Sequence, residues 1–131
     1  MTRFLVIGGS GQLGQCFQTI ADEFPYYDLF FPPKNMVDLT RPKTLQTFYE
    51  SEPFDGIINC AAYTAVDHAE EKRDWADAMN IHSIQNLVEF IELKKVFLIH
   101  FSTDYVFDGE INSSYKEEDL TNPINAYGHS K

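Results

Sequence analysis

The chain has 131 residues, of which 44% are hydrophobic and 15% aromatic, as expected for one folded domain with a substantial core. Its 10 basic and 20 acidic residues give a formal net charge of -10, which argues against nucleic acid and anionic membranes as partners. No apolar run is long enough to span a membrane and no signal-peptide cleavage region is present, so a cytoplasmic location is expected. Cys16 and Cys60 fit neither a metal site nor a disulfide framework, and both are expected to be small buried side chains.

The first third of the chain alternates apolar runs with a helical pattern. Residues 4–7 form an apolar run that stops at two glycines, which is typical of a strand buried on both faces of a parallel sheet. From residue 11 to 23 the apolar positions recur at helical spacing. Residues 27–31 are a second apolar run, and Thr40 is then expected to cap a helix that carries Pro42 in its first turn.

The same alternation continues through the middle of the chain. Residues 56–60 predict a third strand, and residues 68–93 predict one long helix. On that helix Trp75 is expected in the core, and the charged residues 70–74 are expected to form a solvated face. Residues 95–101 contain the fourth apolar run.

Strand and helix in strict alternation predict an α/β fold, a Rossmann-like doubly wound parallel sheet that binds ligands at the carboxyl ends of its strands. The polar residues 108–125 predict a loop over that edge. The fourth apolar run should be covered on both sides, and the chain stops at Lys131 inside a starting helix. Residues 1–131 are therefore expected to be an incomplete nucleotide-binding domain, truncated before the last strands and a substrate domain.

A glycine-rich segment follows the first predicted strand and opens the first helix. Its glycines fit two spacings, GxGxxG and GxxGxxG, in the sequence Gly8-Gly9-Ser10-Gly11-Gln12-Leu13-Gly14. Free backbone N–H groups and the helix dipole at such a turn favour a pyrophosphate. The segment predicts a dinucleotide site on the backbone of residues 11–13.

The end of the second strand lacks the acidic residue that usually binds the adenosine ribose. Pro32, Pro33 and Lys34 follow the strand, and Asp38 comes later, where it is better placed near the adenine. Lys34 could meet the 2′-phosphate of NADP(H) or could be a solvated loop lysine. The cofactor is expected to be NADP(H) or NAD(H).

Tyr127 and Lys131 are four residues apart in a segment that Asn125 can cap as a helix. A nearby ammonium favours the phenolate form of a tyrosine, so the pair suits acid/base chemistry on a carbonyl group. Ser102 and Thr103 stand directly at the carboxyl end of the fourth strand, where a hydroxyl can bind a substrate oxygen. The glycine loop, the strand-end hydroxyls and Tyr-x-x-x-Lys in this order are a strong joint signal for a dinucleotide site with acid/base chemistry on a carbonyl group.

With these motifs in place, the whole chain resembles the dTDP-4-dehydrorhamnose reductases, a group of extended short-chain dehydrogenases/reductases. The segments that carry the resemblance are the glycine loop, Asp38-Leu39-Thr40, the run CAAYTAVD at residues 60–67, the run STDYVFDG at residues 102–109 and the run PINAYGHSK at residues 123–131.

The resemblance implies NAD(P)H-dependent reduction of the 4-keto group of dTDP-4-dehydro-L-rhamnose, the last step of dTDP-L-rhamnose biosynthesis. Tyr127 would give its proton to the sugar carbonyl oxygen, Lys131 would favour the phenolate and hold the nicotinamide ribose, and Thr103 would hydrogen-bond the substrate. Asp104 would lie against the sugar. The resemblance leaves the oligomeric state open, a homodimer included.

The same resemblance implies a set of cofactor contacts along the chain. Asn80 would support the site from the long helix. The other positions are Gly11, Gln12 and Leu13 at the pyrophosphate, Asp38 and Leu39 at the adenine, and Ala62, Tyr63 and Thr64 in the loop after the third strand.

Two other functions share many of these features. A nucleotide-sugar epimerase or dehydratase also carries the glycine loop and Tyr-x-x-x-Lys, but the dehydratases usually have an acidic pair beside the strand-end hydroxyl, where this chain has the single Asp104 before Tyr105. A non-catalytic protein that resembles the regulatory subunit of methionine adenosyltransferase is the second alternative, and the intact Tyr127 and Lys131 argue against it.

Overall fold

A computed structural model describes residues 1–131 as a four-stranded parallel sheet with helices on both faces. The strands are β1 (Thr2–Ile7), β2 (Tyr27–Phe30), β3 (Gly56–Asn59) and β4 (Phe97–His100), in the order β2-β1-β3-β4. Leu5 of β1 pairs with Phe30 on one side and Ile57 on the other. All four carboxyl ends therefore meet at one edge, and the Rossmann-like fold predicted from the sequence is confirmed.

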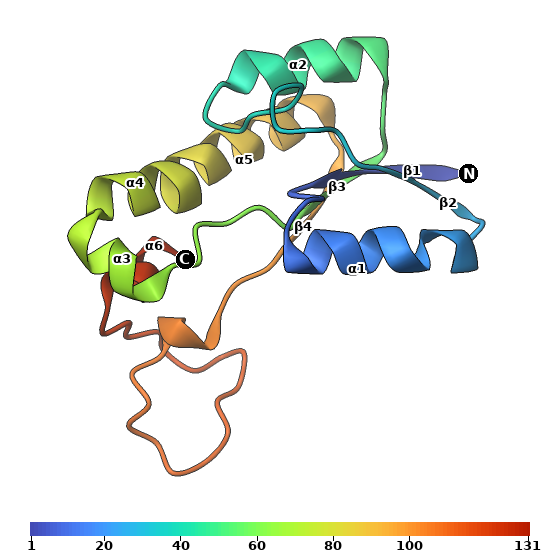
Figure 1. The fold of residues 1–131 in the computed structure, drawn as a ribbon. Helices are drawn as coiled ribbons and strands as arrows, with labels where there is room; N and C mark the ends of the chain where they lie inside the picture. The colour runs from blue at the N-terminus through green and yellow to red at the C-terminus, as the bar shows by residue number, and fades with distance from the viewer.

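The helices cover the sheet in two layers (Figure 1). Helix α1 lies on one face, whereas α2 and α5 lie on the other. In chain order the elements are α1 (Gln12–Ile20), the 3₁₀ turn η1 (Ala21–Glu23), α2 (Pro42–Ser51), α3 (Val66–Glu71), α4 (Arg73–Asp77), the π-helical turn η2 (Ala78–His82), α5 (Ser83–Lys94), the 3₁₀ turn η3 (Asp104–Val106) and α6 (Ala126–Ser130).

The core lies between the sheet and the α2/α5 layer. Leu5, Ile57 and Leu87 are fully buried there, and Phe48 and Phe90 pack beside them. A smaller cluster of Ala69, Ala76, Ala126 and Tyr127 joins α3, α4 and α6. Small alanine side chains allow these short helices to approach closely.

The helical stretch predicted near residues 68–93 is present, but it is not one unbroken α-helix. The chain leaves helical geometry at Lys72, where φ is -126° and ψ is 52°, and α5 starts only after the π-helical turn. Helices α3 and α4 contact α6 through their alanines, whereas Trp75 is 53% exposed and does not join the core.

Two smaller expectations also need correction. Thr40 does not cap α2, because its hydroxyl donates to Asp38 Oδ1 at 2.6 Å and Arg41 takes the cap position without a side-chain hydrogen bond. Cys16 is exposed on α1, and Cys60 is half-buried, so that burial raises the pKa of its thiol.

Strand β4 is an edge strand in this structure. Phe97 is 75% exposed and Ile99 47% exposed, although both belong to the apolar run. None of the helices is both long enough and apolar enough to cross a bilayer.

Candidate functional site

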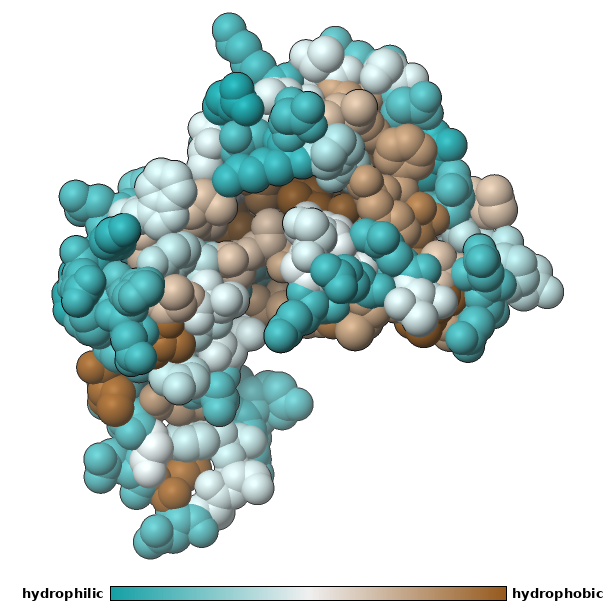
Figure 2. Space-filling view, viewed as in Figure 1, coloured by the Kyte–Doolittle hydropathy of each residue, from teal (hydrophilic) through white to brown (hydrophobic).

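A groove of about 810 Å³ lies along the carboxyl ends of β1, β2 and β3. In Figure 2 apolar surface is visible in the recess between the α2/α5 layer and α1. Of the predicted cofactor residues, the groove is lined by Gly8, Gly11, Lys34, Asp38, Leu39 and Ala62.

The glycine loop can adopt its conformation only because side chains are missing. Gly8 has φ of +83°, and a Cβ there would lie 2.6 Å from the Ala61 backbone nitrogen. A Cβ on Gly14 would lie 2.3 Å from the Gly8 carbonyl oxygen. The loop is therefore packed against both the turn after β3 and the first turn of α1, which brings its backbone to the floor of the groove.

The N-terminus of α1 is open to the groove. Gly11 is its N-cap residue and provides no side-chain cap, so the first N–H groups of the helix have no partner from a capping side chain. The predicted contacts Gln12 and Leu13 stand in this first turn. The free N–H groups of such a turn can donate hydrogen bonds to a phosphate oxygen.

Two glutamines that the sequence analysis did not single out hold this loop. The Gln15 side-chain amide donates to the Ser10 carbonyl oxygen at 2.8 Å, and that of Gln18 donates to the Gly9 carbonyl oxygen at 2.8 Å. Both also line the groove. Their spacing of three residues on α1 places them on one helix face, and this was the available signal.

The end of β2 contributes an apolar wall and one cation. Phe31, Pro32 and Pro33 line the groove beside Lys34, and no carboxylate stands at that strand end. Lys34 is thus the basic side chain of the groove lining.

The Asp38 carboxylate is already engaged within the protein. It accepts hydrogen bonds from the Thr40 hydroxyl at 2.6 Å and the Thr40 N–H at 3.0 Å, and it pairs with Arg41 at 3.2 Å. Burial raises the pKa of Asp38, but the bonds from Thr40 and the charges of Arg41 and Lys34 outweigh burial and leave that pKa below its ordinary value. The carboxylate therefore stabilises the turn before α2, and Asp38 lines the groove as part of that turn.

The turn after β3 is fixed by a buried amide. Asn59, 1% exposed, accepts the Ala61 N–H at 3.1 Å, and its amide nitrogen lies 3.1 Å from Nδ1 of His100 on β4. Burial and the charge of Lys131 lower the pKa of His100. This contact links the groove lining at Ala61 to the end of β4.

Asn80 holds the next residues of that turn. Its side-chain oxygen accepts the Tyr63 N–H at 2.8 Å, and its amide nitrogen donates to the Tyr63 carbonyl oxygen at 3.0 Å and to the Ser130 hydroxyl at 2.8 Å. Asn80 and Tyr63 do not line the groove, nor does the exposed Thr64. Asn80 joins the segment after β3 to α6.

Thr103 and Asp104 lie just beyond β4. Thr103 is the N-cap residue of η3: its hydroxyl oxygen accepts the Tyr105 N–H at 3.3 Å, and its hydroxyl donates to Asp104 Oδ1 at 3.2 Å. Asp104 is exposed, whereas Thr103 is half-buried. Both side chains are outside the groove lining.

The Tyr-x-x-x-Lys segment forms the short helix α6. Asn125 caps it by accepting the Gly128 N–H at 2.7 Å, as predicted. Tyr127 is 8% exposed, and its ring meets that of Tyr105 edge-on at 5.6 Å between centroids. Lys131 follows the helix and donates to the Phe101 carbonyl oxygen at 2.8 Å, and burial lowers the pKa of its ammonium. The structure thus brings Lys131 to the end of β4 and Tyr127 to η3, and no hydrogen bond joins these two side chains.

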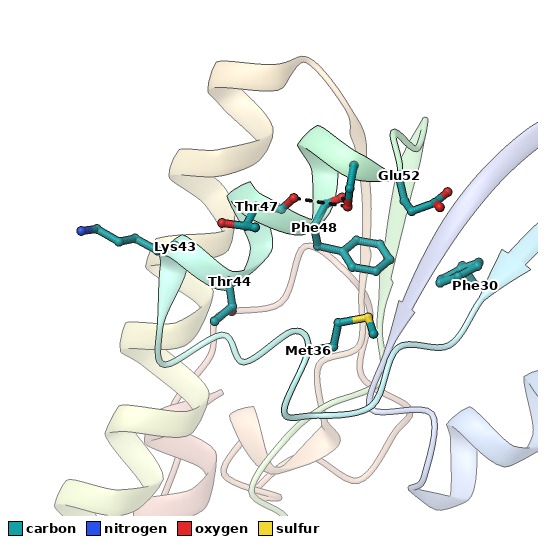
Figure 3. Close-up of a pocket in the computed structure, with 8 residues that line it drawn as sticks. Phe30, Met36, Lys43, Thr44, Thr47, Phe48 and Glu52 are labelled. Carbon is teal, nitrogen blue, oxygen red and sulfur yellow. Dashed lines mark hydrogen bonds between the residues drawn. The ribbon is translucent and has the colours of Figure 1, made fainter.

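A second hollow lies between α2 and β2 and contains none of the predicted site residues. Figure 3 shows Phe30, Met36, Thr44, Phe48 and Glu52 around it, with Lys43 pointing away. No group of three or more His, Cys, Asp or Glu side chains is placed to hold a metal ion.

The parallel sheet, its glycine loop and the groove at its carboxyl edge define a Rossmann-like α/β domain. The family described as the RmlD substrate binding domain matches residues 2–131, and the chain belongs to this family. The resemblance to the dTDP-4-dehydrorhamnose reductases is confirmed.

Proteins named dTDP-4-dehydrorhamnose reductase are similar over the whole chain. The one from Aggregatibacter actinomycetemcomitans is 35% identical over 131 residues, which cover 100% of this chain and 45% of the relative. The one from Burkholderia thailandensis is 38% identical over 98% of this chain and 43% of the relative. The chain thus spans somewhat less than half the length of these relatives.

Solved structures agree with this assignment. The dTDP-4-dehydrorhamnose reductase from Bacillus anthracis str. Ames, determined in complex with NADP, has a TM-score of 0.92 and 36% identity, and the match covers 99% of this chain and 46% of that one.

Proposed function

We propose that the full-length protein reduces the 4-keto group of dTDP-4-dehydro-L-rhamnose with NADPH or NADH, as an enzyme of dTDP-L-rhamnose synthesis. One observation carries the proposal: relatives named dTDP-4-dehydrorhamnose reductase match the chain from end to end. Within the chain, η3 with its cap residue Thr103 contacts α6, which carries Tyr127 and is followed by Lys131.

The groove supports a dinucleotide as cofactor. The loop of Gly8 to Gly14 leaves no room for side chains at its two tightest positions, and the uncapped N-terminus of α1 offers free N–H groups for a pyrophosphate. The related B. anthracis protein was determined in complex with NADP. Lys34 lines the same groove, and a cation there would favour the 2′-phosphate of NADP(H).

A bound reduced nicotinamide would supply the hydride for this reaction. Tyr127 would donate its hydroxyl proton to the developing alkoxide, while the Thr103 hydroxyl would bind the same oxygen. The Lys131 ammonium, held at the end of β4 by the Phe101 carbonyl, would favour proton loss from the phenol. Asp104, exposed beside Thr103, would contact the sugar.

The experiment is an NADPH oxidation assay with dTDP-4-dehydro-L-rhamnose on the full-length protein and its Tyr127→Phe variant. The variant keeps the ring but loses the proton donor, so kcat should fall by on the order of 100-fold or more while the Kd of NADPH stays nearly unchanged. Undiminished turnover in the variant would refute the role of Tyr127, and no turnover of this sugar by the unmodified protein would refute the substrate.

A further inference from the structure

Helix α6 begins with a contact from a residue far away in the sequence. The Ala126 N–H, the first of the helix, donates to Glu70 Oε1 of α3 at 2.6 Å. The other carboxylate oxygen of Glu70 accepts a hydrogen bond from Arg73 at 3.0 Å. Although residues 70–74 were expected to be a solvated face, Glu70 thus bonds on one side to the helix that carries Tyr127.

The contact supplies a hydrogen-bond acceptor that the helix lacks at its first turn. The first N–H groups of any helix lack partners within it, and a carboxylate near them is favoured by the helix dipole. Asn125 satisfies the Gly128 N–H, and Glu70 satisfies that of Ala126. The bond from Ala126, followed by the one from Arg73, lowers the pKa of Glu70, which keeps the carboxylate charged.

Besides the bond to Glu70 at its first residue, α6 is fixed by contacts at Gly128 and Ser130, which follow Tyr127 along the chain. A Cβ on Gly128 would lie 2.2 Å from the Tyr105 carbonyl oxygen, so the helix touches the backbone of η3. Ser130 at the other end accepts a bond from Asn80 at 2.8 Å. Tyr127 lies between these contacts, one residue after the N–H that Glu70 binds.

We propose that Glu70 is a positioning residue, which sets the place of the Tyr127 hydroxyl by fixing the first turn of α6 against α3. The proposal rests on the proposed function, because Tyr127 acts as the proton donor there. Glu70 itself is exposed and lies outside the lining of the dinucleotide groove. Its removal should therefore lower kcat and spare dinucleotide binding.

Two substitutions of Glu70 separate the length of its side chain from its charge, and a third substitution is the control. Glu70→Asp keeps the charge but shortens the side chain by one methylene, so it should lose the Ala126 N–H. Glu70→Gln keeps the reach and an acceptor oxygen without the charge. Glu71→Ala is the matched control, since Glu71 is exposed on the same helix and makes no side-chain hydrogen bond or ion pair.

The test measures kcat, KM for the sugar and Kd for NADPH with the full-length enzyme. Since an error of about 1 Å in placement can cost up to roughly 100-fold in rate, Glu70→Asp should lower kcat by about tenfold. Glu70→Gln should stay within about threefold and Glu71→Ala within about twofold, with the Kd of NADPH unchanged in all three. A Glu70→Asp enzyme with normal kcat, or equal losses in kcat and NADPH affinity, would overturn the proposal.

Amide hydrogen exchange at Ala126 supplies a readout that does not depend on catalysis. Its N–H should exchange about tenfold faster in Glu70→Asp than in the unmodified protein or in Glu70→Gln, since loss of one charge-assisted hydrogen bond is worth about this factor. Equal exchange in all variants would overturn the positioning contact. If the unmodified protein reduces no sugar, the proposed function fails, and the exchange result still decides whether Glu70 fixes α6.

Discussion

At the scale of single residues, the predicted site residues that line the groove differ in whether their side chains are free to bind a cofactor. Gly8, Lys34 and Asp38 all line it, but the Asp38 carboxylate is already bonded to Thr40 and Arg41. We therefore predict that Lys34, the basic side chain of the lining, distinguishes the two dinucleotides.

Substitution of Lys34 tests this assignment. In Lys34→Ala, NADPH should bind about tenfold or more weakly, because a hydrogen bond to a charged group contributes roughly 1.5 to 3 kcal/mol, whereas NADH should bind within about twofold of the unmodified protein. Calorimetric titration with both dinucleotides measures the difference. Lys43→Ala on α2 is the control, since Lys43 points away from the second hollow in Figure 3 and lies outside the groove lining. Equal losses for NADPH and NADH would remove the 2′-phosphate role of Lys34.

At the scale of elements, the polar loop after η3 has an internal organisation of its own. The Phe107 and Tyr115 rings stack at 4.2 Å between centroids. Asp108 accepts bonds from the Tyr115 hydroxyl at 2.7 Å, the Asn122 side chain at 2.9 Å and the Glu110 N–H at 3.0 Å. The Asp108 carboxylate thus joins three points of a loop that has no helix or strand.

The loop should consequently loosen in acid. The bonds from Asn122, Glu110 and Tyr115 lower the pKa of Asp108 from 3.8 to about 2. Because this folded pKa lies below the ordinary value, the stabilisation is fully present above pH 3.8 and is lost as the pH falls toward about 2.

Nuclear magnetic resonance titration of the Asp108 carboxyl and the Tyr115 ring measures this window. Asp108→Asn should abolish the acid transition of the Tyr115 signals. An Asp108 that titrates near its ordinary value, with Tyr115 unaffected, would contradict the structure of this loop.

At the scale of the whole molecule, β4 leaves an apolar strand edge open. Phe97 and Ile99 are exposed on one face of a strand whose second edge has no partner in residues 1–131. Such an edge is a template for pairing with another chain.

Residues 1–131 alone should therefore self-associate as their concentration rises. The double substitution Phe97→Lys and Ile99→Lys should suppress this association, because charged side chains on an edge strand oppose pairing. Leu93→Lys is the control: Leu93 is 72% exposed on α5 and lies off the strand. Sedimentation equilibrium measures the effect, and association that both variants retain would assign the contact to another surface.

The sequence by itself determined the order of the strands and helices, the glycine loop and the cap of α6 at Asn125. These features depend on local signals: runs of apolar residues, glycine where backbones must approach, and a side chain that bonds to its own neighbours. They could be predicted from the sequence because each signal involves residues that are close together along the chain.

Only the tertiary structure decided which polar groups meet across the chain. Helix α3 contacts α6, so that Glu70 reaches Ala126, 56 residues later, while Asn80 joins Tyr63 to Ser130. A surface charge and a partner of a buried N–H look identical in sequence. They differ in free energy only once folding brings a donor within reach and removes the water that would otherwise bind it.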